Sequence, residues 1–224
     1  MTEITVTKNN FDIDNDPTRL AKIGEEVSQR LDSNIGIQKI ENPAMQIYVF
    51  QQFLNERDCQ TLIKNIDQQP VPSGLMTEID QPDFRTSSSC YFDREDADVA
   101  RIGTNISKVL GIDNNFAEPI QGQRYTVGQE FKAHHDFFHT SQNYWLEQKR
   151  FGGQRTWTAM VFLNHVLDGG ATLFPHAKIG VDPQPGTMLI WNNIDVTGIE
   201  NYKSLHAGAP VKKDANTSLQ NGLD

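Results

Sequence analysis

The chain has little cysteine and no long apolar run. Its 224 residues include only two cysteines, Cys59 and Cys90, and these are not in Cys-x-x-Cys spacing. The sequence therefore predicts neither a disulfide framework nor a zinc knuckle. No apolar run approaches the roughly 20 residues that cross a membrane, and residues 1–10 lack the charged start and apolar stretch of a secretory signal. We expect a soluble, cytoplasmic protein with reduced thiols.

Positive charge is also scarce. Lysine and arginine number 20 against 29 aspartate and glutamate residues, which gives a formal net charge of −9. Because phosphate contacts require clustered basic side chains, this balance argues against a nucleic-acid partner. A local basic group is present at Lys132, Lys149, Arg150 and Arg155, although such clusters are most often solvated faces. We expect no nucleic-acid partner and no membrane partner.

Periodicity predicts helices first and strands afterwards. Apolar residues recur every three or four positions over residues 16–31, 55–66 and 98–110, as in amphipathic helices. From Pro119 onward, short β-rich runs are bounded by Gly, Pro, Asn or Asp, over residues 120–127, 131–135, 156–164, 172–174, 187–191 and 204–211. Many short strands with such turns are typical of a sandwich or jelly roll. We predict a mainly β (α+β) fold, a distorted double-stranded β-helix over residues 119–211 with helical support from residues 1–118, in a single domain of residues 1–211.

Two of these β-rich runs, with the residue that follows one of them, supply three potential metal ligands. On a strand, residues i and i+2 point to the same side, so His134 and Asp136 can reach one metal while His135 faces away. His206, in a distant short run with apolar flanks, can supply the third ligand. Two histidines and one carboxylate form the facial triad of Fe(II) oxygenases, which leaves other metal positions open for a co-substrate and O2. Taken alone, the His-x-Asp pair also fits ordinary surface and core residues.

Around these ligands the sequence carries a series of motifs. The series is Arg85-Thr86-Ser87, residues 123–138 (QRYTVGQEFKAHHDFF), Gly152-Gly153-Gln154-Arg155, residues 169–175 (GGATLFP), residues 185–192 (PGTMLIWN) and residues 204–211 (SLHAGAPV). Each Gly-Gly pair alone would indicate only a turn. With the motifs in this order, the sequence from Ile47 to Val211 resembles the prolyl 4-hydroxylase group of Fe(II)/2-oxoglutarate dioxygenases.

The resemblance implies an enzyme similar to procollagen-proline 4-dioxygenases. It implies Fe(II) bound by the two histidines and the aspartate, with 2-oxoglutarate as co-substrate, O2 as oxidant and ascorbate as reductant. It further implies that Tyr125 and Thr172 contact the co-substrate, and that Arg155 lies at the mouth of a groove for a proline-containing peptide or protein. From residue type alone, Tyr125 fits a core aromatic and Thr172 an ordinary strand residue.

The end of the chain departs from the family pattern. Relatives usually carry a basic residue, commonly Lys, ten positions after the distal histidine to pair with the far carboxylate of 2-oxoglutarate, and a Trp soon after it. The corresponding position here is Asn216, and residues 212–224 show no strand pattern and no Trp. We favour a truncated or replaced last strand, which makes residues 212–224 an atypical polar tail. Alternatively, Lys212 or Lys213 replaces the anchor, or the protein uses a smaller 2-oxo acid or none.

A second departure is Phe131, where many relatives have Tyr. The missing hydroxyl removes one hydrogen bond that the substrate could receive. This departure bears on the identity of the substrate more than on the iron site.

Several functions remain open from the sequence. The leading prediction is hydroxylation of a peptidyl proline, and a rival within the same chemistry is hydroxylation of a free amino acid or other small molecule. The altered tail also allows a degenerate, non-catalytic metal-binding protein. A zinc hydrolase would use the same ligands plus water, but the motif series argues against it. A wide groove lined by Arg155 would favour peptides, whereas a closed, small pocket would favour a free amino acid.

Overall fold

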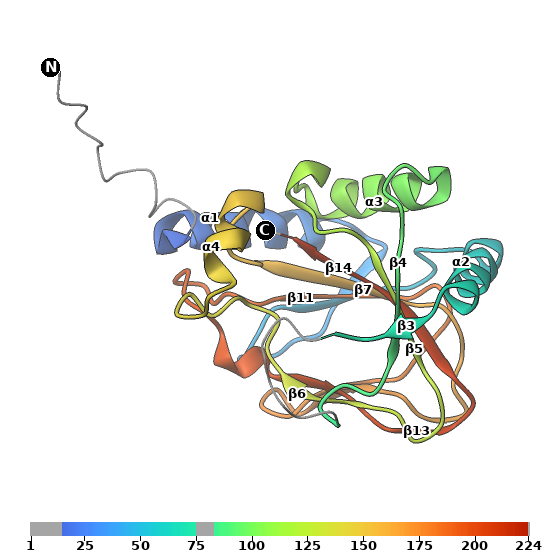
Figure 1. Cartoon of the computed structure of the whole chain (residues 1–224). Helices are drawn as coiled ribbons and strands as arrows, with labels where there is room; N and C mark the ends of the chain where they lie inside the picture. Colours follow the sequence, from blue (N-terminus) through green and yellow to red (C-terminus); the bar gives the residue numbers. More distant parts are fainter. Residues whose placement is uncertain (1–14, 75–82, 224) are drawn as a thin grey trace, which may run out of the picture.

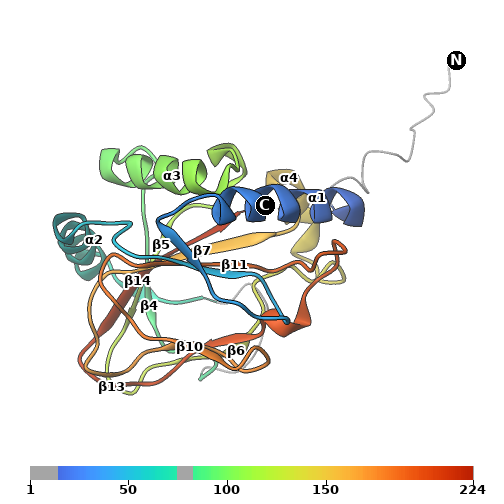
Figure 2. The ribbon, with the colours of Figure 1, turned by 180° about the vertical axis from the view of Figure 1, so that it is seen from behind.

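The computed structural model describes residues 15–74 and 83–223 as two facing antiparallel sheets with helices on the outer face of the larger one (Figures 1 and 2). The strands are β1 (Ile37–Lys39), β2 (Ile47–Phe50), β3 (Val71–Pro72), β4 (Ser88–Tyr91), β5 (Gln121–Tyr125), β6 (Phe131–His134), β7 (Trp157–Phe162), β8 (Asp168–Gly169), β9 (Thr172–Phe174), β10 (Ile179–Val181), β11 (Met188–Asn192), β12 (His206–Gly208), β13 (Val211–Lys213) and β14 (Asn216–Leu223). The larger sheet has the order β1-β2-β11-β7-β14-β5-β4-β3, the smaller one has the order β10-β9-β12-β6, and β13 pairs with β8.

The helices begin at side-chain caps that the sequence provides. They are α1 (Pro17–Asp32), α2 (Glu56–Gln68), α3 (Ala97–Leu110) and α4 (Trp145–Phe151), with two 3-10 turns, η3 (Asn114–Phe116) and η4 (Tyr202–Ser204). Asp16, Asn55 and Asp96 each accept a hydrogen bond from a backbone N–H of the first turn of α1, α2 and α3. The first three helices confirm the predicted ones, whereas α4 was not predicted.

The central strands of the larger sheet are buried on both faces. In β7, Trp157, Ala159 and Val161 belong to the core that the helices cover. Met160 and Phe162 alternate with them and belong to the core that also contains Phe174 of the smaller sheet. Because each large apolar side chain contributes roughly 1.5–3 kcal/mol when buried, these two layers hold the helices and both sheets together.

Strand β14 corrects the prediction for the end of the chain. The expectation that residues 212–224 form a polar tail without a strand is wrong for residues 216–223, because β14 lies between β7 and β5 and pairs with both. Leu219 and Leu223 pack into the helix-covered core, while Asn216, Ser218 and Gln220 line a pocket on the opposite face. The apolar–polar alternation that predicts strands is absent because the positions that alternate with the pocket face also include the polar residues Thr217 and Asn221, both buried.

The predicted fold class is confirmed. Each predicted β-rich run contains a strand, and the fold is the predicted arrangement of facing antiparallel sheets with supporting helices. Both cysteines are free and buried. Within the part of the chain that the structure describes, no helix is both long and apolar enough to cross a bilayer.

Candidate metal centre

The three predicted ligands converge on one point in the smaller sheet. His134 ends β6, His206 begins β12, and the two are cross-strand partners. Asp136 follows β6, and its Oδ1 lies 3.6 Å from His134 Nε2 and 3.7 Å from His206 Nε2. One ligand atom from each residue lies within 4.8 Å of the others. A single metal ion can therefore contact all three side chains.

The hydrogen bonds of both imidazoles leave their Nε2 atoms for a metal. His134 Nδ1 lies 2.8 Å from Lys132 O, and His206 Nδ1 lies 3.0 Å from Ser204 O. Because a carbonyl oxygen only accepts, Nδ1 carries the proton in each ring, and the Nε2 lone pair is free. Burial and, secondarily, the neighbouring His206 lower the pKa of His134 to about 3. This ring is therefore neutral near pH 7, as metal binding requires.

Asp136 is held in place by three other side chains. Its Oδ2 accepts hydrogen bonds from Thr158 Oγ1 at 2.8 Å and from Gln220 Nε2 at 3.0 Å. Arg155 Nη1 donates to the Asp136 backbone carbonyl at 2.9 Å and lies 3.6 Å from Oδ1. Burial alone would raise the pKa of Asp136, but His206 and Arg155 contribute to lowering it to about 2. The carboxylate is ionised, and Oδ1 is left to face the histidines.

Arg155 connects Asp136 to the opposite wall of the site. Its Nε and Nη2 donate to the carboxylate of Glu118, Nη2 at a distance of 2.8 Å, which is a bidentate ion pair. Its guanidinium also lies 4.6 Å from the ring centroid of Phe138. Gly222 of β14 leaves room for the pair, because an added Cβ would overlap Glu118 Oε1. The structure therefore places Arg155 in the wall of the site, already bonded to both neighbouring segments.

Two pockets meet at the ligands. The outer one is a groove of about 560 Å³ whose lining includes Asp136 and Arg155, and the inner one is a small cavity of about 40 Å³. His134 and Phe131 line both. The Phe131 ring stacks on the His134 imidazole, with 3.6 Å between centroids and 19° between planes. Phe131, the second departure from the family pattern, thus supports a metal ligand.

The inner pocket contains the two predicted co-substrate contacts. Tyr125 of β5 and Thr172 of β9 both line it. Tyr125 donates a hydrogen bond to Gln123 Oε1 at 3.1 Å. The turn that leads to Thr172 requires glycine, because Gly169 has φ +82° and an added Cβ would overlap Pro210 O. Both residues therefore line the inner pocket, and their contact with the co-substrate stays a prediction.

Arg85 is a site residue to which the sequence analysis assigned no role, although its motif belongs to the quoted series. Its guanidinium lies 4.8 Å from the Phe131 ring centroid and lines the outer groove. It donates to Ser87 Oγ at 3.1 Å and to Gln121 Oε1 at 3.3 Å. Burial raises the pKa of Tyr125, and the nearby Arg85 opposes this shift. Arg85 thus lies on the wall that separates the two pockets.

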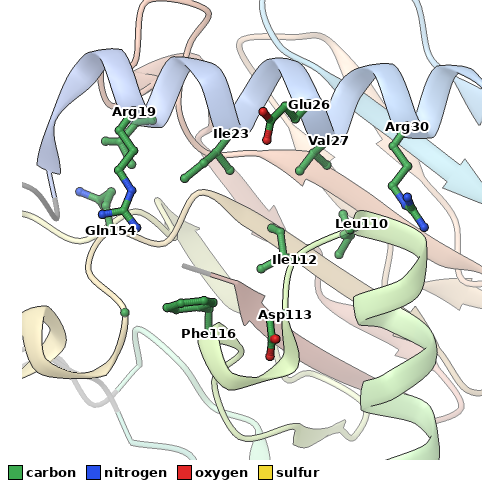
Figure 3. Close-up of a pocket in the computed structure, with 13 residues that line it drawn as sticks. Arg19, Ile23, Glu26, Val27, Arg30, Leu110, Ile112, Asp113, Phe116 and Gln154 are labelled. Carbon is green, nitrogen blue, oxygen red and sulfur yellow. The ribbon is translucent and has the colours of Figure 1, made fainter.

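A separate cavity lies between α1 and α3, away from the three ligands (Figure 3). It measures about 350 Å³, and its lining includes apolar side chains and two arginines, namely Ile23, Val27, Leu110, Ile112, Arg19 and Arg30. Arg30 is already bonded, because its Nη2 donates to Lys108 O at the end of α3 at 2.7 Å. Gln154 also lines this cavity. Its Nε2 donates to Phe138 O at 2.9 Å, two residues after the ligand Asp136. None of the three ligands lines it, and we assign it no chemistry.

Comparison with known sequences gives one family. Residues 120–220, from β5 into β14, match the family described as the 2OG-Fe(II) oxygenase superfamily. Prolyl 4-hydroxylase 2 of Arabidopsis thaliana is 29% identical over 190 residues, which cover 73% of this chain and 62% of that protein. Prolyl 4-hydroxylase subunit alpha-1 of Homo sapiens is 32% identical over 143 residues, which cover 63% of this chain and 26% of that protein. The chain thus spans less than two thirds of the length of these relatives.

Two solved structures share the fold. The viral collagen prolyl hydroxylase of Paramecium Bursaria Chlorella virus-1, solved as a 2OG complex, has a TM-score of 0.59 at 24% identity and covers 86% of this chain and 97% of that chain. A prolyl hydroxylase from Trichoplax adhaerens, solved with a hypoxia inducible factor oxygen degradation domain peptide fragment, has a TM-score of 0.60 at 13% identity, with coverages of 92% and 90%.

Proposed function

We propose that the chain is a member of the prolyl 4-hydroxylase group of the 2OG-Fe(II) oxygenases, and that it is an Fe(II)- and 2-oxoglutarate-dependent dioxygenase that hydroxylates a proline in a peptide or protein. The observation that carries this proposal is the cluster of His134, Asp136 and His206 at the junction of two pockets. O2 would be the oxidant and ascorbate the reductant. A cytoplasmic location is part of the proposal and is consistent with two free cysteines.

The donor set fits Fe(II). Two imidazoles and one carboxylate lie on one side of a common point, as in the facial triad. Bound iron would supply the oxidising power to use O2 on an unactivated C–H bond. The protein contributes the position of the carboxylate: Thr158 and Gln220 occupy Oδ2 of Asp136, so Oδ1 stays turned toward the metal position.

The far carboxylate of 2-oxoglutarate fits less well, because no lysine or arginine lines the inner pocket in the described part of the chain. Lys212, one of the candidate replacements, pairs with Asp168 at 3.3 Å on the surface, and Lys213 is exposed. Neither lysine therefore replaces the missing anchor in this structure.

The outer groove supports a peptide substrate. Six phenylalanine and tyrosine side chains line it, namely Phe84, Tyr91, Phe131, Phe137, Phe138 and Tyr144. Proline-rich segments in the polyproline II conformation dock in aromatic-lined grooves, because the rings pack against the flat faces of the pyrrolidines. Arg155 lies in the same lining, where its bonds to Glu118 and to the Asp136 carbonyl fix the wall of the groove. An open groove of about 560 Å³ favours a peptide over a free amino acid.

The test is oxygen transfer to proline. The full chain is incubated with Fe(II), excess 2-oxoglutarate, ascorbate, O2 and proline-rich peptides, and mass spectrometry follows the gain of one oxygen atom on proline together with succinate release. We expect oxygen transfer by the native chain and none by His206→Ala. A matched control is His176→Ala, because His176 is exposed and lies outside the cluster. Iron binding without oxygen transfer to any peptide would contradict the proposed function.

A further inference from the structure

The inner pocket is neutral where a second carboxylate would need a cation. Beside two of the metal ligands, its lining includes Tyr125, Thr172, Trp191, Asn216 and Ser218, and the described lining contains no lysine or arginine. Arg85 lies on the outer side of the wall and lines the other pocket. An ion pair with the far end of a dicarboxylate is therefore absent from this pocket.

Asn216 presents a hydrogen-bond acceptor in place of the missing cation. It is 7% exposed, and its Nδ2 donates to Gly170 O at 3.0 Å. The amide orientation follows from this bond, because the reversed amide would bring two oxygens together. Asn216 Oδ1 has no hydrogen-bond partner among the described residues. A buried acceptor without a partner is unfavourable, and a ligand group that donates to it would remove the cost.

The same pocket lining contains an unpartnered donor. Trp191 belongs to this lining, and its Nε1 is buried without a partner among the described residues. One neutral donor and one neutral acceptor match a primary amide, which accepts through its oxygen and donates through its NH2 group. A carboxylate, which only accepts, can satisfy Trp191 but not Asn216.

We propose that the inner pocket binds the far end of a 2-oxo acid through neutral hydrogen bonds, so that a 2-oxo acid ending in a primary amide binds at least as tightly as 2-oxoglutarate. This inference rests on the proposed function and names its class of co-substrate. The metal would bind the 2-oxo acid head in both cases. Asn216 Oδ1 would distinguish the two acids, because it accepts a hydrogen bond from the amide NH2 group and repels a carboxylate oxygen.

The test compares 2-oxoglutarate with its far-end monoamide. Each is titrated anaerobically into the Fe(II)-loaded full chain, and the weak visible charge-transfer band reports binding without turnover. We expect the amide to have the same Kd as 2-oxoglutarate or a lower one. Asn216→Lys should tighten 2-oxoglutarate binding roughly 10- to 100-fold through a charge-assisted hydrogen bond, and should not tighten binding of the amide. Asp214→Lys, on the exposed turn before β14, is the matched control for added charge.

The outcomes separate this inference from the proposed function. If the native chain binds 2-oxoglutarate at least ten times more tightly than the amide, the neutral-pocket inference is wrong while the proposed function stands. If Arg85→Gln weakens binding of 2-oxoglutarate but not of the amide, Arg85 is the anchor and the inference is again wrong. If Fe(II) binds but neither acid produces the band, the proposed function fails and the inference fails with it. The comparison of the two Kd values on the native chain tests the inference even if Asn216→Lys does not fold.

Discussion

Replacing Arg155 by Ala removes the link between Asp136 and the opposite wall of the site. The side chain of Arg155 is 12% exposed and that of Glu118 is 25% exposed. Truncating one partner of a buried pair costs roughly 3–5 kcal/mol, but water can reach Glu118, so we expect a smaller loss of about 2–3 kcal/mol. In a chain of this size each kcal/mol lowers Tm by roughly 2–4 °C, so Tm should fall by roughly 4–12 °C.

Thermal unfolding of the metal-free protein measures this loss, with Arg150→Ala as control because Arg150 is exposed. Kinetics then test the groove. Thr158 and Gln220 still hold the carboxylate of Asp136 in the variant, so substrate-free turnover of the 2-oxo acid should persist while KM for a proline-containing peptide rises. An unchanged Tm would show that the ion pair contributes nothing to stability. Loss of both turnovers together would mean that Arg155 supports the iron site, and its role in the peptide groove would be withdrawn.

Five further substitutions test the site and its supports. His134→Ala, Asp136→Ala and His206→Ala should each abolish iron-dependent turnover and the charge-transfer band, since three ligands share one ion; an unchanged band in all three would refute the assignment. Thr158→Val keeps the side-chain shape but removes a hydrogen bond to Asp136. The affinity for Fe(II), measured by equilibrium binding, should therefore fall roughly 10- to 100-fold. An unchanged affinity would mean that this hydrogen bond does not orient Asp136 for the metal. Gly222→Ala should lower the midpoint of urea unfolding, because the new methyl group overlaps the Glu118–Arg155 pair; an unchanged midpoint would show that the pair can move aside.

Local patterns were sufficient for most of the fold. Apolar spacing and capping residues are local, so they predicted α1, α2 and α3 and most of the strands. They failed at β14, where only Leu219 and Leu223 face the helix-covered core and polar side chains line the pocket face. Strand β14 forms because β5 and β7 offer ladder partners on both sides. This pairing joins segments that are distant in the sequence, so the eight residues of β14 do not predict it by themselves.

The sequence by itself determined the fold class and the identities of the three candidate ligands. The i, i+2 spacing predicted His134 and Asp136 on one side, and the motif series pointed to His206; in the structure β6 ends at His134 and Asp136 follows it. Only the tertiary structure decided what surrounds them: Gln220 on the ligand carboxylate, the Arg155–Glu118 pair across the wall, and an inner pocket without a cation in its described lining. The physical reason is that each of these features joins segments far apart in the chain. Their distances are set by sheet pairing and packing, which no local spacing encodes.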